Sequence, residues 1–404
     1  MNSRFFGAAI ILGLLSAIGP FAIDMYLPAL PSIKESLHTD VDTAQMSLMA
    51  FFISLGVGQL IYGPVSDMLG RKTPIYFGLV VFALGSIGCA LAPDIHTLIA
   101  FRFFQGLGAC AGMVIPRAIV RDMHTGHDAA RLMALLMLVF SVSPILAPLT
   151  GSIVIKFTSW RGIFWTVMGA AICGLILAIT VLKETRPREL RVDSTFGSAL
   201  RSYGTLLRDR HYLGLIFIGS FGVASFFAYL ANSSFILINH YGLTETQYSM
   251  AFSINAIAFI GAAQFAGKLG AKHGLAKVVR AAVTGYAATM VVLLLLNIAG
   301  INQLPVLMAV LFVGYGFLGL VIPSTAVLAL DDHGKIAGTA AALMGTMQFV
   351  VGAAVVGVIG RFFNGTALPM VAGIAGCSLI AFTLAQVTLR HRRYVREQPA
   401  EEAA

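Results

Sequence analysis

The apolar positions of this chain gather in twelve long runs that are separated by polar stretches. An α-helix needs about 20 mainly apolar residues to cross the hydrocarbon core of a bilayer. The pattern therefore predicts an all-α integral membrane protein with twelve transmembrane helices. We place them near residues 6–33, 44–66, 74–92, 97–118, 132–155, 163–182, 212–240, 247–267, 279–298, 304–330, 338–360 and 367–389.

One polar stretch is much longer than the others, is rich in arginine and shows no apolar periodicity. It covers residues 184–211 and divides the runs six and six. We therefore expect an N-terminal six-helix bundle, a cytoplasmic linker, a C-terminal six-helix bundle and a cytoplasmic tail. Their predicted bounds are 1–183, 184–211, 212–390 and 391–404.

Short sequences recur in equivalent runs of the two halves. Gly112-Met113-Val114-Ile115-Pro116 in the fourth run returns as Gly319-Leu320-Val321-Ile322-Pro323 in the tenth. The stretch from Gly63 to Gly70 has a degenerate counterpart from Gly267 to Gly274, at nearly the same distance along the chain. Such repeats predict two pseudo-symmetric bundles related by a two-fold axis along the membrane normal.

Composition and charge support a membrane location and suggest an orientation. Hydrophobic residues make up 58% of the chain and charged residues 11%, whereas soluble domains carry roughly 25% charged residues. The net charge of +9 is distributed as the positive-inside rule requires if both termini are cytoplasmic. It therefore indicates topology and not a nucleic-acid partner. At the outer ends of the runs stand only Lys34, Lys156, Arg161 and Arg361.

Two ionisable residues lie deep inside predicted spans, Asp24 in the first and Arg102 in the fourth. A charge at this depth costs several kcal/mol unless it is paired or hydrated, so each is a functional candidate. Both fall in the outer half of the membrane, where the carboxyl and guanidinium groups could meet. We expect a proton-coupling pair, with a purely structural ion pair between two helices as the alternative.

The fifth and seventh runs carry further candidates. Pro144, Pro148 and Gly151 predict a bent fifth helix in close contact with a neighbour. We assign them a role in the direction of transport, with a purely structural kink as the alternative. Aromatic and polar residues in the seventh run suit a cavity for amphipathic ligands. The candidate set for the substrate cavity is Met25, Tyr26, Gln105, Phe226, Tyr229 and Asn232.

A polar turn joins the second and third runs, and its sequence is Gly63-Pro64-Val65-Ser66-Asp67-Met68-Leu69-Gly70-Arg71-Lys72. Its glycines permit a tight turn, and Asp67 and Arg71 have the i,i+4 spacing of an ion pair. A carboxylate at this cytoplasmic turn can also cap the start of a neighbouring helix, and a solvated loop with ordinary charges is the alternative.

The sequence contains no recognisable motif for binding a metal or a nucleotide. The four cysteines lie in apolar runs without metal-ligand spacing, and the sequence has neither a phosphate-binding loop nor a metal-ligand cluster. We therefore expect no metal and no cofactor, and transport that draws on an ion gradient.

Four stretches resemble motifs of the major facilitator superfamily, and specifically of its bicyclomycin/chloramphenicol-type (Bcr/CflA) drug efflux group. The turn from Gly63 to Lys72 resembles the loop motif, Arg102 to Gly106 the R-x-x-Q-G motif of helix four, and Ala147 to Gly151 the helix-five antiporter motif. The last of these matches in part, because Ala147 and Ser152 stand where glycine is usual. Asp24-Met25-Tyr26-Leu27-Pro28-Ala29-Leu30-Pro31 resembles the helix-one signature of the Bcr group.

The resemblance implies drug:proton antiport by alternating access in a bacterial inner membrane. Asp24 would take part in proton or drug binding with Arg102 close by, and Asp67, Arg71 and Asp122 would form a gating cluster. Partners would be protons, a drug-like molecule and membrane lipid, and we expect a monomer. An uptake symporter for a metabolite remains open as an alternative, whereas a membrane-embedded enzyme finds no nucleophile or metal set to support it.

Overall fold

The computed structural model describes residues 3–123, 126–191 and 196–396, and within these ranges it is built from helices joined by turns and short connections. Twelve described helical segments are long and apolar enough to cross a membrane, which confirms the predicted fold class. These spans are Ala9–Ser36, Val41–Leu69, Lys72–Leu91, Ile95–Met123, Arg131–Phe157, Trp160–Thr180, Arg210–His240, Glu245–His273, Leu275–Ile298, Leu304–Asp331, Ala337–Arg361 and Leu368–Leu389.

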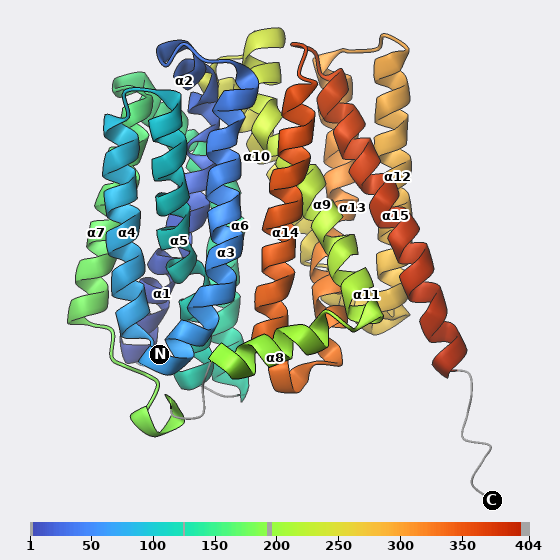
Figure 1. Ribbon diagram of the computed structural model, residues 1–404. Helices are drawn as coiled ribbons and strands as arrows, with labels where there is room; N and C mark the ends of the chain where they lie inside the picture. The colour runs from blue at the N-terminus through green and yellow to red at the C-terminus, as the bar shows by residue number, and fades with distance from the viewer. Residues whose placement is uncertain (1–2, 124–125, 192–195, 397–404) are drawn as a thin grey trace, which may run out of the picture. The chain divides into compact units, whose positions relative to one another are not determined.

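The helices are labelled in Figure 1. The first half contains α1 (Ser3–Asp24), α2 (Leu30–Ser36), α3 (Val41–Leu69), α4 (Lys72–Leu91), α5 (Ile95–Met123), α6 (Gly126–Phe157) and α7 (Trp160–Thr180). The second half contains α9 (Arg210–Ser234), α10 (Glu245–Ala263), α11 (Ala266–His273), α12 (Leu275–Ile298), α13 (Leu304–Asp331), α14 (Ala337–Arg361) and α15 (Leu368–Arg396). A π-helical segment, Phe235–His240, continues α9.

The first span is not one continuous helix. It ends as an α-helix at Asp24, passes through a 3₁₀ turn at Leu27–Ala29, and resumes as α2. Pro28 explains the break, because it has no N–H to donate to the carbonyl of Asp24 and its ring disfavours a continuing helix. The candidate carboxyl group is therefore positioned where the helix is interrupted.

The internal repeat is also found in backbone conformation. Gly70 and Gly274 end the two repeated stretches, each at the end of a helix, with φ of 90° and 85°. Such a positive φ is accessible to glycine at little cost. The chain therefore leaves the second and eighth spans through similar turns.

The linker differs from the expectation. We predicted no apolar periodicity over residues 184–211, but the structure contains a 3₁₀ turn at Arg188–Arg191 and a helix, α8, at Phe196–Leu206. Phe196, Leu200 and Tyr203 recur at a spacing of three to four residues, which is a helical period that the richness in arginine concealed.

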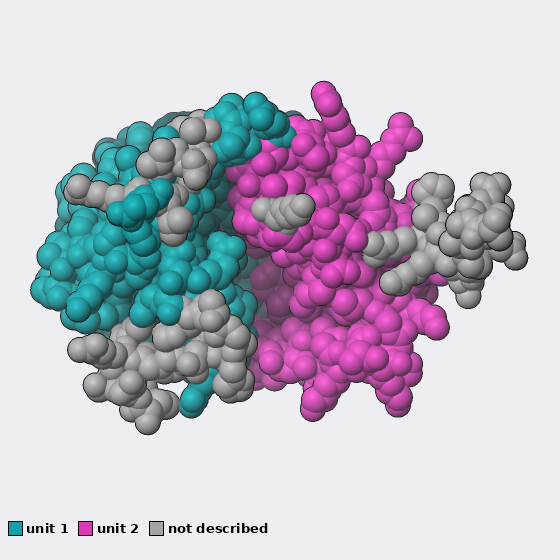
Figure 2. Space-filling model, turned by 90° about the horizontal axis from the view of Figure 1, so that it is seen from below, with its two compact units in different colours: residues 1–201, 230–254, 356–366 teal, residues 202–229, 255–355, 367–404 magenta. Residues whose placement is uncertain are grey.

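The residues group into two compact units, which Figure 2 colours separately. Unit 1 contains residues 1–201 together with 230–254 and 356–366, and unit 2 contains 202–229, 255–355 and 367–404. Unit 1 therefore holds all six spans of the first half. It also holds the ends of α9, α10 and α14 that the predicted topology places on the outer side of the membrane. The compact units thus divide at different residues from the two sequence halves.

Polar contacts explain why these ends belong to unit 1. The Gln45 amide donates to the carbonyl of Ala231 at 3.1 Å and to Asn232 Oδ1 at 2.9 Å. Ser249 Oγ donates to the Pro148 carbonyl at 2.9 Å, and Ser253 Oγ to that of Ile145 at 3.0 Å. Helices from both sequence halves are thus hydrogen-bonded at the end of unit 1 that carries α2.

Candidate functional site

The Arg102 guanidinium is fully buried between two aromatic rings of unit 1. Its Cζ lies 4.4 Å from the ring centre of Tyr26 and 4.2 Å from that of Phe51, as in cation–π contacts. Nη1 donates to Gln105 Oε1 at 2.7 Å and to the Ala22 carbonyl at 3.2 Å. The R-x-x-Q spacing produces the first bond, because residues three apart share a helix face.

A polar chain continues from Arg102 into the next helix. Gln105 Nε2 donates to Ser86 Oγ at 2.8 Å, so α5 and α4 are joined inside the bundle. Arg102 Nε and Nη2 have no acceptor among the described residues. The N–H groups of two buried guanidinium nitrogens therefore stay available for a further acceptor.

Asp24 is 5% exposed at the end of α1. No ion pair joins it to Arg102 in the part of the chain that the structure describes, although Arg102 contacts the carbonyl of Ala22, two residues earlier. The structure thus brings the cation to the segment that carries the carboxyl group without pairing them. Their pairing stays a prediction.

The cavity candidates fall into two groups. Met25 and Tyr26 are buried at the break of the first span, and the Tyr26 hydroxyl is 2.7 Å from Ser47 Oγ. In unit 2, the half-buried Phe226 stacks on Phe259, with ring centres 5.8 Å apart. Asn232 belongs to unit 1, where Gln45 is its donor.

Sequence reasoning missed several polar residues of unit 2. Asn255 Nδ2 donates to the Tyr229 hydroxyl at 3.0 Å, and the Tyr315 ring lies 5.4 Å from the Tyr229 ring. All three side chains are buried. The amide of Asn255 inside an apolar run could have identified this cluster, because a buried polar group needs a hydrogen-bond partner.

The helix-five motif packs tightly against the first span. A Cβ built on Gly151 would lie 2.9 Å from the Cα of Met25 and closer still to its carbonyl oxygen. Glycine is thus required where α6 meets the break after α1, which confirms the predicted close contact. The carbonyls of Ile145 and Pro148, on the same helix, accept the serine hydroxyls of α10.

Replacing Gly151 with alanine is expected to destabilise the protein by about 1–3 kcal/mol, because backbone must move to admit the methyl group. Gly169→Ala is the matched control, since nothing lies within 4 Å of a Cβ built there. Thermal unfolding in detergent measures both. Equal melting temperatures for the two variants would show that the contact at Gly151 is not tight.

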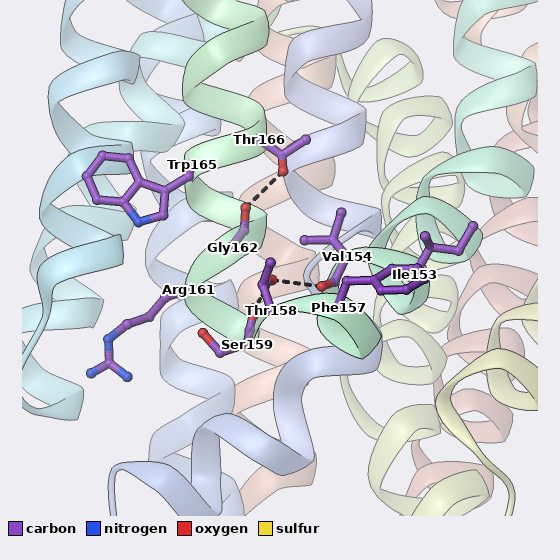
Figure 3. A pocket seen from close by; sticks show the side chains of 9 residues that line it. All are labelled: Ile153, Val154, Phe157, Thr158, Ser159, Arg161, Gly162, Trp165 and Thr166. Atoms are coloured by element: carbon purple, nitrogen blue, oxygen red, sulfur yellow. Dashed lines mark hydrogen bonds between the residues drawn. The ribbon is translucent and has the colours of Figure 1, made fainter.

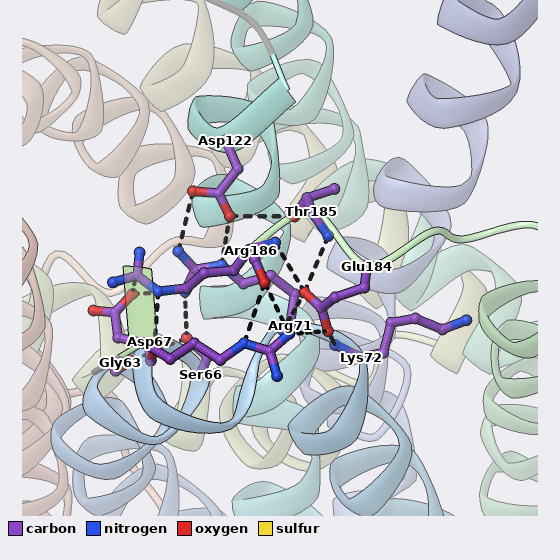
Figure 4. Close-up of polar contacts among 10 residues, drawn as sticks. Gly63, Ser66, Asp67, Arg71, Lys72, Asp122, Glu184, Thr185 and Arg186 are labelled. Carbon is purple, nitrogen blue, oxygen red and sulfur yellow. Dashed lines mark hydrogen bonds and ion pairs between the residues drawn. The ribbon is translucent and has the colours of Figure 1, made fainter. Parts of the chain in front are cut away.

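The polar turn forms a charge cluster with the start of the linker (Figure 4). The Arg71 side chain is 3% exposed and donates to Asp122 through Nε at 2.6 Å and Nη2 at 3.1 Å. Nη1 donates to Asp67 and to Ser66, each at 2.8 Å. Burial alone would lower the pKa of Arg71, but the two carboxylates raise it. Asp67, Arg71 and Asp122 are therefore brought together.

Two other members of the predicted gating motif lie differently. The Lys72 ammonium is 5.5 Å from the centre of the Tyr76 ring. No atom lies within 4 Å of a Cβ built on Gly63, so its lack of a side chain is not sterically required in this state. Gly70 is the glycine whose conformation the turn needs.

Glu184, which sequence reasoning missed, caps the start of α4. Its carboxylate accepts the backbone N–H of Arg71 at 2.9 Å and of Lys72 at 3.3 Å. Arg186 and Arg191 of the linker bind the same turn, through the carbonyls of Asp67 and Leu69. The linker thus fixes the conformation of the turn, which could not be read from local spacing.

The cap should make stability depend on pH. Burial would raise the pKa of Glu184, but hydrogen bonds from the N–H groups of Arg71, Arg186 and Lys72 lower it overall. A depressed carboxyl pKa contributes stability above the unfolded pKa of about 4.3, and this is lost as pH falls through the folded value. Glu184→Gln should therefore lower the melting temperature at pH 7, by an amount that corresponds to about 1 kcal/mol.

Thermal unfolding of the parent and the variant at pH 7 and below about pH 4 tests this expectation. The difference between them should shrink progressively as pH falls, because the parent carboxylate then also becomes protonated. A difference that is independent of pH would assign the effect of Glu184 to shape and not to charge.

Comparison with known proteins places these motifs in a family. Residues 12–357 match the Major Facilitator Superfamily. The chain is 38% identical over 368 residues to the uncharacterized MFS-type transporter YdgK of Bacillus subtilis, covering 90% of each. It is 29% identical over 373 residues to the bicyclomycin resistance protein homolog of Haemophilus influenzae, covering 92% of this chain and 93% of that one.

Solved structures agree on the fold. A crystal structure of a D-xylose-proton symporter superposes with a TM-score of 0.74 at 16% identity, covering 95% of this chain and 97% of that one. With twelve spans and bacterial relatives, the chain is a multi-pass protein of the cell inner membrane. It belongs to the Major Facilitator Superfamily, in the group that includes the bicyclomycin resistance proteins.

Proposed function

We propose that this protein exports small amphipathic, drug-like molecules in exchange for protons, by alternating access of its two halves. The observation that carries the proposal is Asp24, a buried carboxyl group at a helix break with no ion pair among the described residues. A carboxyl group without a fixed partner can gain and lose a proton as its surroundings change. When Asp24 loses its proton, its carboxylate could accept hydrogen bonds from Arg102, whose buried Nε and Nη2 have no acceptor among the described residues.

The chemistry of the remaining candidates supports drug-like substrates. Phe226 presents a half-buried aromatic side chain, and the phenol and amide groups of Tyr229 and Asn255 lie in the same unit. Ligand sites for drug-sized molecules combine apolar and aromatic walls with a few polar groups. Such walls accept many apolar shapes, as a multidrug exporter requires.

The proposal also includes the topology, the oligomeric state and the energy source. We propose cytoplasmic termini from the distribution of Lys and Arg, a monomer as the working form, and no cofactor. The energy source is the proton gradient. The protein transports its substrate without changing it chemically.

Transport by everted membrane vesicles tests the direction. Export predicts that acidifying the vesicle interior drives uptake of a substrate such as bicyclomycin, the compound named in one relative, and that an uncoupler abolishes it. An uptake symporter predicts proton-driven accumulation in right-side-out vesicles instead, and an enzyme predicts a changed compound. Either result would overturn the proposal.

A further inference from the structure

An open cavity lies at the turn between α6 and α7 and has a volume of about 630 Å³. Its lining comes from the last residues of α6 and the first turns of α7 (Figure 3). The span that includes α6 ends at Phe157 and that of α7 begins at Trp160. The cavity therefore lies where two transmembrane helices reach the membrane–water boundary.

We call this open cavity the trough, and most of the surface that lines it is apolar. Figure 3 shows Arg161 and Trp165 projecting from one side of α7, with Ile153 and Phe157 beyond its other side. Gly162 is also in the lining, and the side chains of Thr158 and Val154 pack against its Cα. Phe157 is 78% exposed, Ile153 55% and Trp165 42%. These surfaces are open to the lipid that surrounds the protein.

The hydroxyl groups of the two threonines in the lining already donate to helix carbonyls, and the lining also contains Ser159. Thr158 Oγ1 donates to the Val154 carbonyl at 2.7 Å, and Thr166 Oγ1 donates to that of Gly162 at 2.9 Å. A ligand that lies in the trough therefore meets mainly apolar contacts. A hydrocarbon chain packs against such a surface by dispersion contacts, whereas a sugar or a nucleotide finds few hydrogen-bond partners there.

Positive charge collects at this turn. Lys156 and Arg161 are two of the four cations that the sequence places at the outer ends of the spans. Neither forms an ion pair within the described ranges. Arg161 donates to the Ala92 carbonyl at 2.9 Å and lies 4.1 Å from the centre of the Trp160 ring, so its position is fixed. Asp94, on the same neighbouring loop as Ala92, is engaged by Thr97.

We propose that this trough binds an anionic phospholipid of the outer leaflet. One acyl chain lies along the apolar walls, and the phosphate group is bound by Arg161 and Lys156. Guanidinium groups bind phosphate by charge-assisted hydrogen bonds, and tryptophan is favoured at the headgroup level. The occupant is a lipid because the trough is open to the membrane and the cations stand at its boundary.

The chain carries a built-in reporter for this site. Its sequence contains two tryptophans: Trp165 lines the trough, and the Trp160 ring contacts the lining residue Arg161. Phosphatidylglycerol with brominated acyl chains quenches tryptophan fluorescence on contact. Titration of the purified full-length protein in detergent should therefore show saturable quenching by this lipid. Brominated phosphatidylcholine, which carries no net charge, should quench at markedly higher concentration.

Charge variants locate the site. Lys156→Gln should weaken half-maximal quenching by phosphatidylglycerol about fivefold, and adding Arg161→Gln should weaken it by about that factor again. Lys156 is exposed and forms no ion pair with another described residue that the change would break. The matched control is Lys34→Gln with Arg361→Gln, which removes the other two outer cations and should leave quenching unchanged.

Three outcomes would overturn the proposal. Equal quenching by both lipids would show a trough that accepts any acyl chain, without headgroup recognition. Equal loss in the control would show general electrostatic attraction. Relief of quenching by millimolar inorganic phosphate would identify a phosphate-ion site in place of a lipid site.

Discussion

Replacing Asp24 with asparagine is expected to abolish both drug-evoked proton release and accumulation of drug against a gradient. The amide has nearly the shape of the carboxyl group and keeps the helix break, which Pro28 determines. It cannot ionise, so it resembles a permanently protonated state. Proton release on adding substrate to purified protein in detergent measures the effect directly.

The size of the loss follows from the energy that one proton supplies. A charge that crosses a potential of 100 mV is worth about 2.3 kcal/mol, which supports roughly a 50-fold gradient of a neutral drug. Without a titrating group this coupling disappears. Downhill exchange of neutral compounds should persist, because it needs no proton.

Glu35→Gln is the matched control for Asp24→Asn. Glu35 lies in α2, in the same span, but its side chain is exposed. This variant should release protons like the parent protein. If Asp24→Asn also releases protons like the parent, the coupling group lies elsewhere and the assignment of Asp24 is wrong.

The fold was predictable because the membrane limits what the sequence can do. A helix that crosses lipid must satisfy its own backbone and present apolar side chains, so run length alone defined the spans. The break after Asp24 and the Asp67–Arg71 pair were also accessible, since proline chemistry and i,i+4 spacing are local. Both appear in the structure.

Partners that are distant in sequence could not be derived in the same way. Gln45 meets Asn232 across 187 positions, and Glu184 reaches the N–H of Arg71 across 113. Each of these residues is recognisable in the sequence as a polar group in or beside an apolar run. No sequence pattern indicated which distant residue would be its hydrogen-bond partner. The partner is selected by packing of whole helices, which single-sequence periodicity does not describe.

A large effect on stability is also expected at Asp122. Its carboxylate accepts two hydrogen bonds from Arg71, whose side chain is 3% exposed while that of Asp122 is 17% exposed. Asp122→Asn leaves a buried guanidinium without its main counterion, and breaking a buried ion pair costs about 3–5 kcal/mol. Asp67 and Ser66 still accept from Arg71, so we expect a loss of about 2 kcal/mol and a clear drop in melting temperature.

Asp67→Asn provides the internal comparison, because it removes the other carboxylate from the same arginine. The Asp67 side chain is 43% exposed, and an exposed pair contributes at most about 1 kcal/mol. Its melting temperature should stay near that of the parent.

Substrate should still bind to Asp67→Asn, because Asp67 lies in the polar turn at the end of its span and not in the proposed substrate cavity. Transport should slow if the charge cluster gates the alternating-access movement. Thermal unfolding, equilibrium binding of substrate and vesicle transport separate these effects. Equal destabilisation by the two variants would show that burial does not set the strength of the pairs, and loss of binding in Asp67→Asn with an intact fold would place this carboxylate in the substrate site.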